Sequence, residues 1–170
     1  QLKPLRWCDR DGNVRRIYGR PRKFQYTKLT ERDDFIKIVA EFKCSDTLSY
    51  DDTEIYAELE ANASPLYVTR QKGNASAWLR LLLLGPIDHP IITIGDQQIE
   101  LNYDLEAGGL VEISSYPWQR RAINDGGYNL SPLLIGKTQY LDRLKLPEAG
   151  VPCPVRWTAE SVSTWVPTIQ

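Results

Sequence analysis

Hydrophobic and polar side chains alternate along much of the second half of the chain. Single polar residues separate Ile99, Leu101 and Tyr103, and an acidic residue separates Val111 from Ile113. A period of two places neighbouring side chains on opposite faces of a pleated ribbon. Both segments are therefore predicted to be half-buried strands.

Glycine-rich turns lie between these strands. Residues 106–109 read Glu-Ala-Gly-Gly, and residues 125–127 read Asp-Gly-Gly. Because glycine adopts positive φ without a Cβ clash, such turns join antiparallel neighbours. The pattern predicts strands at 66–70, 77–84, 90–94, 98–103, 110–114, 119–123, 139–145 and 154–158. Strands at this spacing are enough to close an antiparallel two-sheet sandwich.

The first third of the chain has a separate strand signal at 33–44. Apolar residues occupy every second position from Ile36 to Cys44, with Lys37, Glu41 and Lys43 among the intervening positions. This period fits a strand better than a helix. Weaker signals predict further elements, namely a strand at 23–27, a strand or helical turn at 54–60, and a last strand at 164–169.

The composition favours an all-β fold class. The chain has 170 residues, 42% of them hydrophobic and 25% charged, with eleven glycines and eleven prolines. Turn-forming, aromatic and β-branched residues are typical of strands and turns rather than helices. A polar segment at 62–65 ends in proline and reads as a linker. We therefore predict a first domain at 1–62, a sandwich at 63–160, and a C-terminal strand within 161–170 that returns to the first domain.

The cysteines and the hydropathy indicate where in the cell the protein is made and whether it contacts a membrane. Cys8, Cys44 and Cys153 are far apart and form no CxxC pair, which indicates reduced structural thiols made in a reducing cytoplasm. No apolar run approaches the ~18 residues that cross a bilayer, so we expect no membrane partner. The chain starts with Gln and lacks methionine, so we expect it to be part of a longer or processed protein.

Charge is divided sharply between two blocks near the start of the chain. Residues 1–30 hold nine Lys/Arg and two Asp/Glu, and residues 31–60 hold three Lys/Arg and ten Asp/Glu. The first block therefore carries +7 and the second −7. These blocks could pair within one fold, or match opposite surfaces of neighbouring copies in a head-to-tail ring.

The sequence gives little support to catalysis or metal binding. His89 is the single histidine and lies in a turn, without a nucleophile signature beside it. The pairs Asp33-Asp34 and Asp51-Asp52 would point to opposite faces of a strand, so solvated turns explain them better than acid–base chemistry. A calcium loop at 46–54 has no recognised spacing. We predict no catalytic residue, no metal ligand and no cofactor.

Two clusters are candidates for binding. Arginines at 15, 16, 20 and 22 interleave with aromatic residues, as in nucleic-acid patches, but the acidic block beside them favours a protein–protein or internal role. We therefore expect no nucleic-acid partner. Tyr116, Trp118 and Tyr128 form an aromatic and polar cluster. Core packing explains such aromatics most simply, and the alternative is contact with a glycan.

Several turns and strands of the chain, taken in order, resemble those of the distal tail protein family of long-tailed bacteriophages, which includes minor tail proteins of phages that infect actinobacteria. Asp46 and Tyr50 match an Asp-x-x-x-Tyr segment that ends a strand. The residues that match its later turns and strands are Gly73-Asn74-Ala75, Gly85 to Pro90, Leu105 to Gly108, Val111 to Ser114, Asn124-Asp125-Gly126 and Leu146 to Gly150.

The resemblance covers residues 35–158 and implies a galectin-like sandwich that follows a ring-forming β domain. Family members have a longer ring-forming domain than residues 1–62 provide. The resemblance also implies a structural, non-enzymatic protein at the virion tail tip. Six copies would form a ring at the distal end of the tail tube, where the ring joins the tail tube protein to the tail-tip or baseplate hub proteins.

The charge blocks suggest which residues would meet across such a ring. We expect basic side chains of one copy to face acidic side chains of the next, the candidates being Arg15, Arg16, Arg20, Arg22, Asp51, Asp52, Glu54 and Glu58. The rival interpretation is a carbohydrate-binding module that contacts host-surface glycan through Tyr116, Trp118 and Tyr128.

Overall fold

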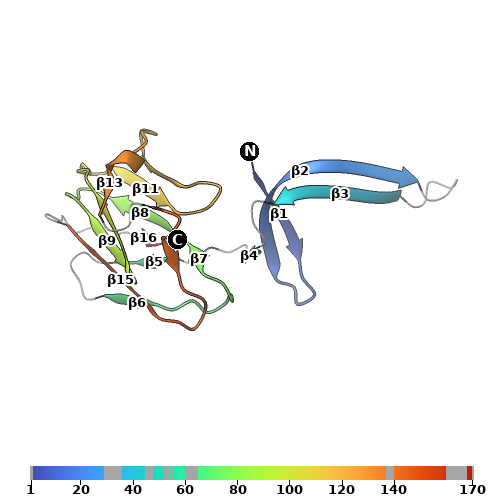
Figure 1. The fold of residues 1–170 in the computed structure, drawn as a ribbon, viewed down its shortest axis with the longest axis horizontal. Helices are drawn as coiled ribbons and strands as arrows, with labels where there is room; N and C mark the ends of the chain where they lie inside the picture. Colours follow the sequence, from blue (N-terminus) through green and yellow to red (C-terminus); the bar gives the residue numbers. More distant parts are fainter. Residues whose placement is uncertain are drawn as a thin grey trace. The chain divides into compact units, whose positions relative to one another are not determined.

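The protein is built from antiparallel strands in two compact units, residues 1–54 and residues 55–170 (Figure 1). The computed structural model describes residues 2–28, 36–44, 48–51, 54, 56–59, 65–136, 140–159 and 168–169. Within these ranges the regular elements are strands and one 3₁₀ turn, Ser131–Leu133 (η1). The predicted all-β fold class is confirmed.

The first unit is organised around one long strand. β2 (Val14–Lys28) pairs through its first half with β1 (Lys3–Cys8) and with β4 (Tyr50–Asp51). Its second half pairs with β3 (Ile36–Cys44), and the two run together as a long ribbon in Figure 1. β3 matches the predicted strand, and residues 33–35 lie outside the described ranges. β2 is far longer than the predicted 23–27.

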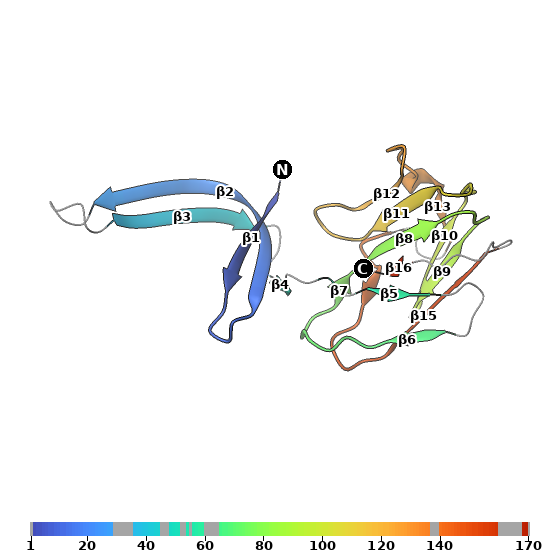
Figure 2. The same ribbon diagram turned by 180° about the vertical axis from the view of Figure 1, so that it is seen from behind.

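The second unit is a sandwich of two five-stranded sheets, seen from behind in Figure 2. One sheet has the order β13-β10-β9-β15-β6, formed by Leu134–Ile135, Gln97–Leu101, Ile91–Ile94, Cys153–Thr158 and Leu66–Val68. The other has the order β12-β11-β8-β16-β5, formed by Arg121–Asn124, Leu110–Ser114, Arg80–Leu84, Thr168–Ile169 and Ala57–Glu58. A small ribbon joins β7 (Ala77–Trp78) to β14 (Lys145–Leu146).

Alternation along the strands forms the core of the sandwich. Ile99 and Leu101 of β10 and Val111 and Ile113 of β11 are fully buried, as the period of two predicted. The largest side chain in the core is that of Trp157, in β15. Its indole N–H donates to the carbonyl oxygen of Leu59, 3.1 Å away, and so connects β15 to the start of the unit.

The boundary between the two units lies nearer to the start of the chain than the sequence predicted. The predicted boundary lies at 62/63, whereas the units separate at 54/55 because β5 and the buried Leu59 belong to the sandwich. The C-terminal strand β16 also differs from the expected return to the first domain. It pairs with β5 on one side and with β8 on the other, and so lies inside a sheet of the second unit.

Two predicted strands are shorter than expected for local reasons. The segment 77–84 breaks at Leu79, whose backbone N–H and C=O bind the side chain and backbone of Ser115 instead of continuing one ladder. The segment 139–145 forms only the start of β14. Tyr140 and Leu141 accept turn hydrogen bonds from Arg143 and Leu144, and a turn excludes a ladder there.

Candidate interaction surfaces

The β2–β3 hairpin has one apolar and one polar face. Directly opposite residues on paired strands project to the same side of a sheet. Phe24 lies opposite Ala40, and Tyr26 lies opposite Ile38. We call this side the hairpin apolar face, and its residues are Pro21, Phe24, Tyr26, Ile36, Ile38, Ala40 and Phe42, with Lys28 opposite Ile36 at its outer end. The other side carries Arg20, Lys23, Gln25, Thr27, Lys37, Val39, Glu41 and Lys43.

An irregularity in β2 sets this division. The register of β2 against β3 shifts between Pro21 and Lys23, so Arg22 is an additional residue without an opposite partner. A single added residue reverses which side chains face which side of the sheet. Without it, Lys23 and Gln25 would lie among the apolar residues of β3, and Phe24 and Tyr26 would face the polar side.

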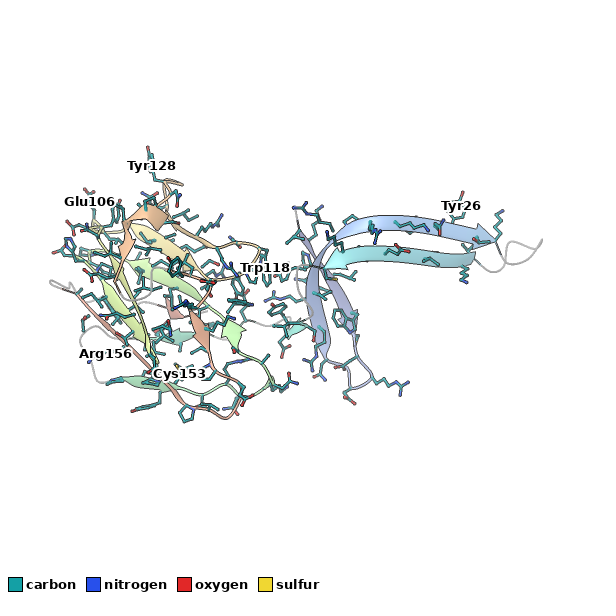
Figure 3. The ribbon with its side chains drawn as sticks, viewed as in Figure 1. Tyr26, Glu106, Trp118, Tyr128, Cys153 and Arg156 are labelled. Atoms are coloured by element: carbon teal, nitrogen blue, oxygen red, sulfur yellow. The ribbon has the colours of Figure 1, made fainter. Side chains whose placement is uncertain are left out.

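The hairpin apolar face is uncovered in the single chain. Phe24 is 68% exposed, Tyr26 is 70% exposed and Ile38 is 61% exposed, and Tyr26 projects from the outer part of the ribbon in Figure 3. Soluble monomers rarely expose contiguous apolar surface of this kind, and a two-stranded hairpin alone is marginally stable in water. This exposure makes the hairpin apolar face a candidate surface for contact with another chain.

The structure places two of the candidate arginines in contacts within one chain. Arg16 donates from Nη2 to Oε1 of Glu54 at 3.1 Å, and its side chain is largely buried. Arg15 lies 3.5 Å from Asp9 and pairs across the ladder with Asp51. Arg16 and Glu54 therefore pair within one chain. This contact makes them less suitable candidates for a contact between copies.

The remaining charged candidates are dispersed. Arg20 lies on the polar side of the hairpin, and Arg22, at the irregularity, lines a surface hollow with Glu41. Glu58 belongs to β5 of the second unit, and Asp52 lies outside the described residues. Contacts of Arg20, Arg22 and Glu58 with a neighbouring copy stay a prediction.

The three aromatic candidates for glycan contact do not come together. Tyr116 and Trp118 stack with ring centroids 5.0 Å apart and planes inclined by 19°. Tyr128 is 72% exposed and follows the turn at the other end of β12 (Figure 3). A contact of Tyr116 and Trp118 with a glycan stays a prediction, and Tyr128 does not share their location.

His89 lies at a turn with φ of 45° and is held on both sides of its ring. Nε2 lies 2.8 Å from Oδ1 of Asn102, and Nδ1 lies 3.0 Å from Oδ1 of Asp104. These contacts hold the turn against the segment after β10. Among the described residues, no three His, Cys, Asp or Glu side chains gather as a metal site, and no helix is long and apolar enough to span a membrane.

The three thiols should differ in reactivity. Cys8 and Cys44 are exposed, whereas Cys153 is buried in the sandwich, where desolvation raises the pKa of its thiol. Because the thiolate is the reactive form, we expect an aromatic disulfide reagent near pH 8 to modify Cys8 and Cys44 about a hundredfold faster than Cys153. Peptide mass mapping at timed intervals measures the three rates. Equal rates would contradict the packing of β15.

The chain thus comprises two antiparallel units, a sandwich and a hairpin whose apolar face is exposed. No protein-family model and no curated protein matches the chain. The fold is similar to the crystal structure of SPP1 Dit (gp 19.1), described as a paradigm of the hub adsorption apparatus in phages that infect Gram-positive bacteria. The TM-score is 0.60 at 16% identity, and the match covers 95% of this chain and 64% of that chain.

This similarity confirms the galectin-like antiparallel sandwich predicted from the sequence. The chain spans less than two thirds of the length of SPP1 Dit. Sequence reasoning missed one residue near the aromatic cluster, Trp78, because only the fold brings β7 beside the loop 115–120. The sequence offered one signal for Trp78: it is a large aromatic residue on the side of the predicted strand 77–84 that also carries Arg80.

Proposed function

We propose that the chain is a structural protein of a phage tail tip. Six copies form a closed ring at the distal end of the tail tube and join the tail tube protein to the tail-tip or baseplate hub proteins. The similarity of the fold to SPP1 Dit supports this proposal. The observation that carries it is the hairpin apolar face, which is a surface built for another protein chain.

A ring needs two different faces on each subunit, and the hairpin supplies one of them. Among the described residues, no strand pairs with the outer edge of β3. Open backbone donors and acceptors at that edge can extend a neighbour's sheet, while the hairpin apolar face is buried by the same neighbour. Arg20 and Arg22 then contribute charge at the rim, where they fix register more than affinity.

The experiment is to determine the mass and shape of the purified protein. Light scattering after size exclusion should give six times the mass of one chain at high concentration, and negative-stain images should show rings with a central opening. Cys44 adds a local readout, because it continues the line of alternate residues that forms the hairpin apolar face.

In the ring, Cys44 should react with a thiol reagent at least about tenfold more slowly than in diluted single chains. Cys8, at the turn end of β1, is the internal reference. A single-chain mass at every concentration, or equal Cys44 rates in both preparations, would reject self-assembly through this face.

A further inference from the structure

Hydrogen bonds restrain the loop that carries Tyr116 and Trp118. The Ser115 N–H donates to the carbonyl oxygen of Leu79 at 2.9 Å, and the Leu79 N–H donates to Oγ of Ser115 at 2.8 Å. Within the loop, Gln119 donates through its backbone N–H to the carbonyl oxygen of Tyr116 at 2.9 Å and closes a turn. The backbone of this loop is therefore held in one conformation before any ligand arrives, which lowers the entropic cost of binding.

The aromatic rings at this loop lie outside the hydrophobic core of the sandwich. Trp78, Tyr116 and Trp118 are partly buried, but none belongs to the hydrophobic core or to the residues packed against it. Trp78 precedes Leu79 and Tyr116 follows Ser115. The hydrogen bonds between Leu79 and Ser115 therefore bring Trp78 alongside Tyr116 in the two neighbouring backbone segments.

Two cations gather on the ring of Trp78. Nζ of Lys145 lies 3.9 Å from its centroid, and the guanidinium carbon of Arg120 lies 5.5 Å from it. Neither cation forms an ion pair with a carboxylate in the part of the chain that the structure describes. The nearby Glu112 is bound by Arg121 at 3.0 Å. Positive charge that no described carboxylate neutralises thus adjoins an aromatic ring.

We propose that these residues bind an oligosaccharide that carries acidic units. The aromatic–cation cluster comprises Trp78, Tyr116, Trp118, Arg120 and Lys145. The C–H face of a pyranose has the partial positive charge that an aromatic face attracts, so one sugar stacks on the Tyr116–Trp118 pair. The carboxylate of an adjacent unit reaches Arg120 and Lys145, which cation–π contact with Trp78 holds in position.

The surrounding charge disfavours a nucleic acid at this cluster. Residues 55–170 contain nine Lys/Arg and twelve Asp/Glu, so a polyphosphate would approach a net negative unit. An oligosaccharide in which neutral units separate the acidic ones has a lower charge density. An acidic peptide offers the carboxylates but lacks the flat C–H face that matches stacked rings.

Calorimetric titration of the full chain with hyaluronan hexasaccharide, which alternates acidic and neutral units, tests the proposal. We expect binding that weakens about tenfold in Trp118→Ala, because a stacking surface is lost. Arg120→Gln should weaken binding of this probe about threefold or more and leave binding of neutral chitohexaose unchanged. Tyr128→Ala is the matched aromatic control and should bind like the wild type.

Several results would overturn the proposal. These are absence of binding at millimolar hexasaccharide, equal affinity in Trp118→Ala and wild type, or tighter binding of a thymidine decanucleotide or a glutamate-rich peptide. Circular dichroism checks that each variant is folded. If Trp118→Ala does not fold, Arg120→Gln decides the question, because Arg120 is exposed and its removal leaves the loop hydrogen bonds intact.

Discussion

Replacement of Ile38 by aspartate is expected to abolish self-assembly while both units stay folded. Ile38 lies in the middle of the hairpin apolar face, opposite Tyr26, and is 61% exposed in the single chain. A carboxylate there costs little while the hairpin is free, but a neighbour that covers the face would bury an unpaired charge. We expect the association constant to fall at least about a hundredfold.

Sedimentation velocity over a hundredfold range of concentration, measured for wild type and Ile38→Asp, detects this change. The matched control is Gln25→Asp, which adds the same charge to the same hairpin on its polar side. This control should assemble normally. Equal loss of assembly in both variants would indicate a general charge effect, and normal assembly of Ile38→Asp would mean that the hairpin apolar face is not the contact.

The alternation of apolar residues predicted which side chains are buried in the sandwich. In a strand with one buried face, a period of two determines which side chains are buried. The core accordingly contains Ile99, Leu101, Val111 and Ile113. The same rule predicted the apolar side of β3. It could not predict that this side would be exposed in the single chain, because alternation identifies a face and not what covers it.

Features that depend on distant contacts or local irregularities could not be predicted. The division of β2 into apolar and polar sides follows from one additional residue near Arg22, which alternation within β2 alone does not reveal. The assignment of β5 to the sandwich depends on pairing with β16, more than a hundred residues further along the chain. Likewise, Trp78 joins the aromatic–cation cluster through the hydrogen bonds between Leu79 and Ser115 and through the pairing of β7 with β14.

The interface candidates show the same limit. The opposite charges of the two blocks predicted pairing either within one chain or between neighbouring copies, and left open which of the two occurs. The contact of Arg16 with Glu54 arises because β4 pairs with β2 at Arg15 and Arg16. A sequence pattern fixes the sign of such charges but not whether their partner is in the same chain or in a neighbour.

Truncation of Trp157 is expected to destabilise the second unit more than any other substitution considered. Its ring is buried between the sheets, and its N–H satisfies the carbonyl oxygen of Leu59. We expect Trp157→Ala to lower the free energy of unfolding by about 3–5 kcal/mol, a large share of a typical domain's stability. Trp157→Phe keeps much of the apolar volume and should cost about 1–3 kcal/mol, since the Leu59 carbonyl loses its donor.

Urea unfolding followed by far-ultraviolet circular dichroism measures both values without relying on tryptophan fluorescence. Trp118→Ala is the matched control, because it removes the same side chain from a surface loop outside the core. We expect that change to cost less than about 1 kcal/mol. If Trp157→Ala were no more harmful than Trp118→Ala, β15 would not hold the two sheets together and the core described for the sandwich would be incorrect.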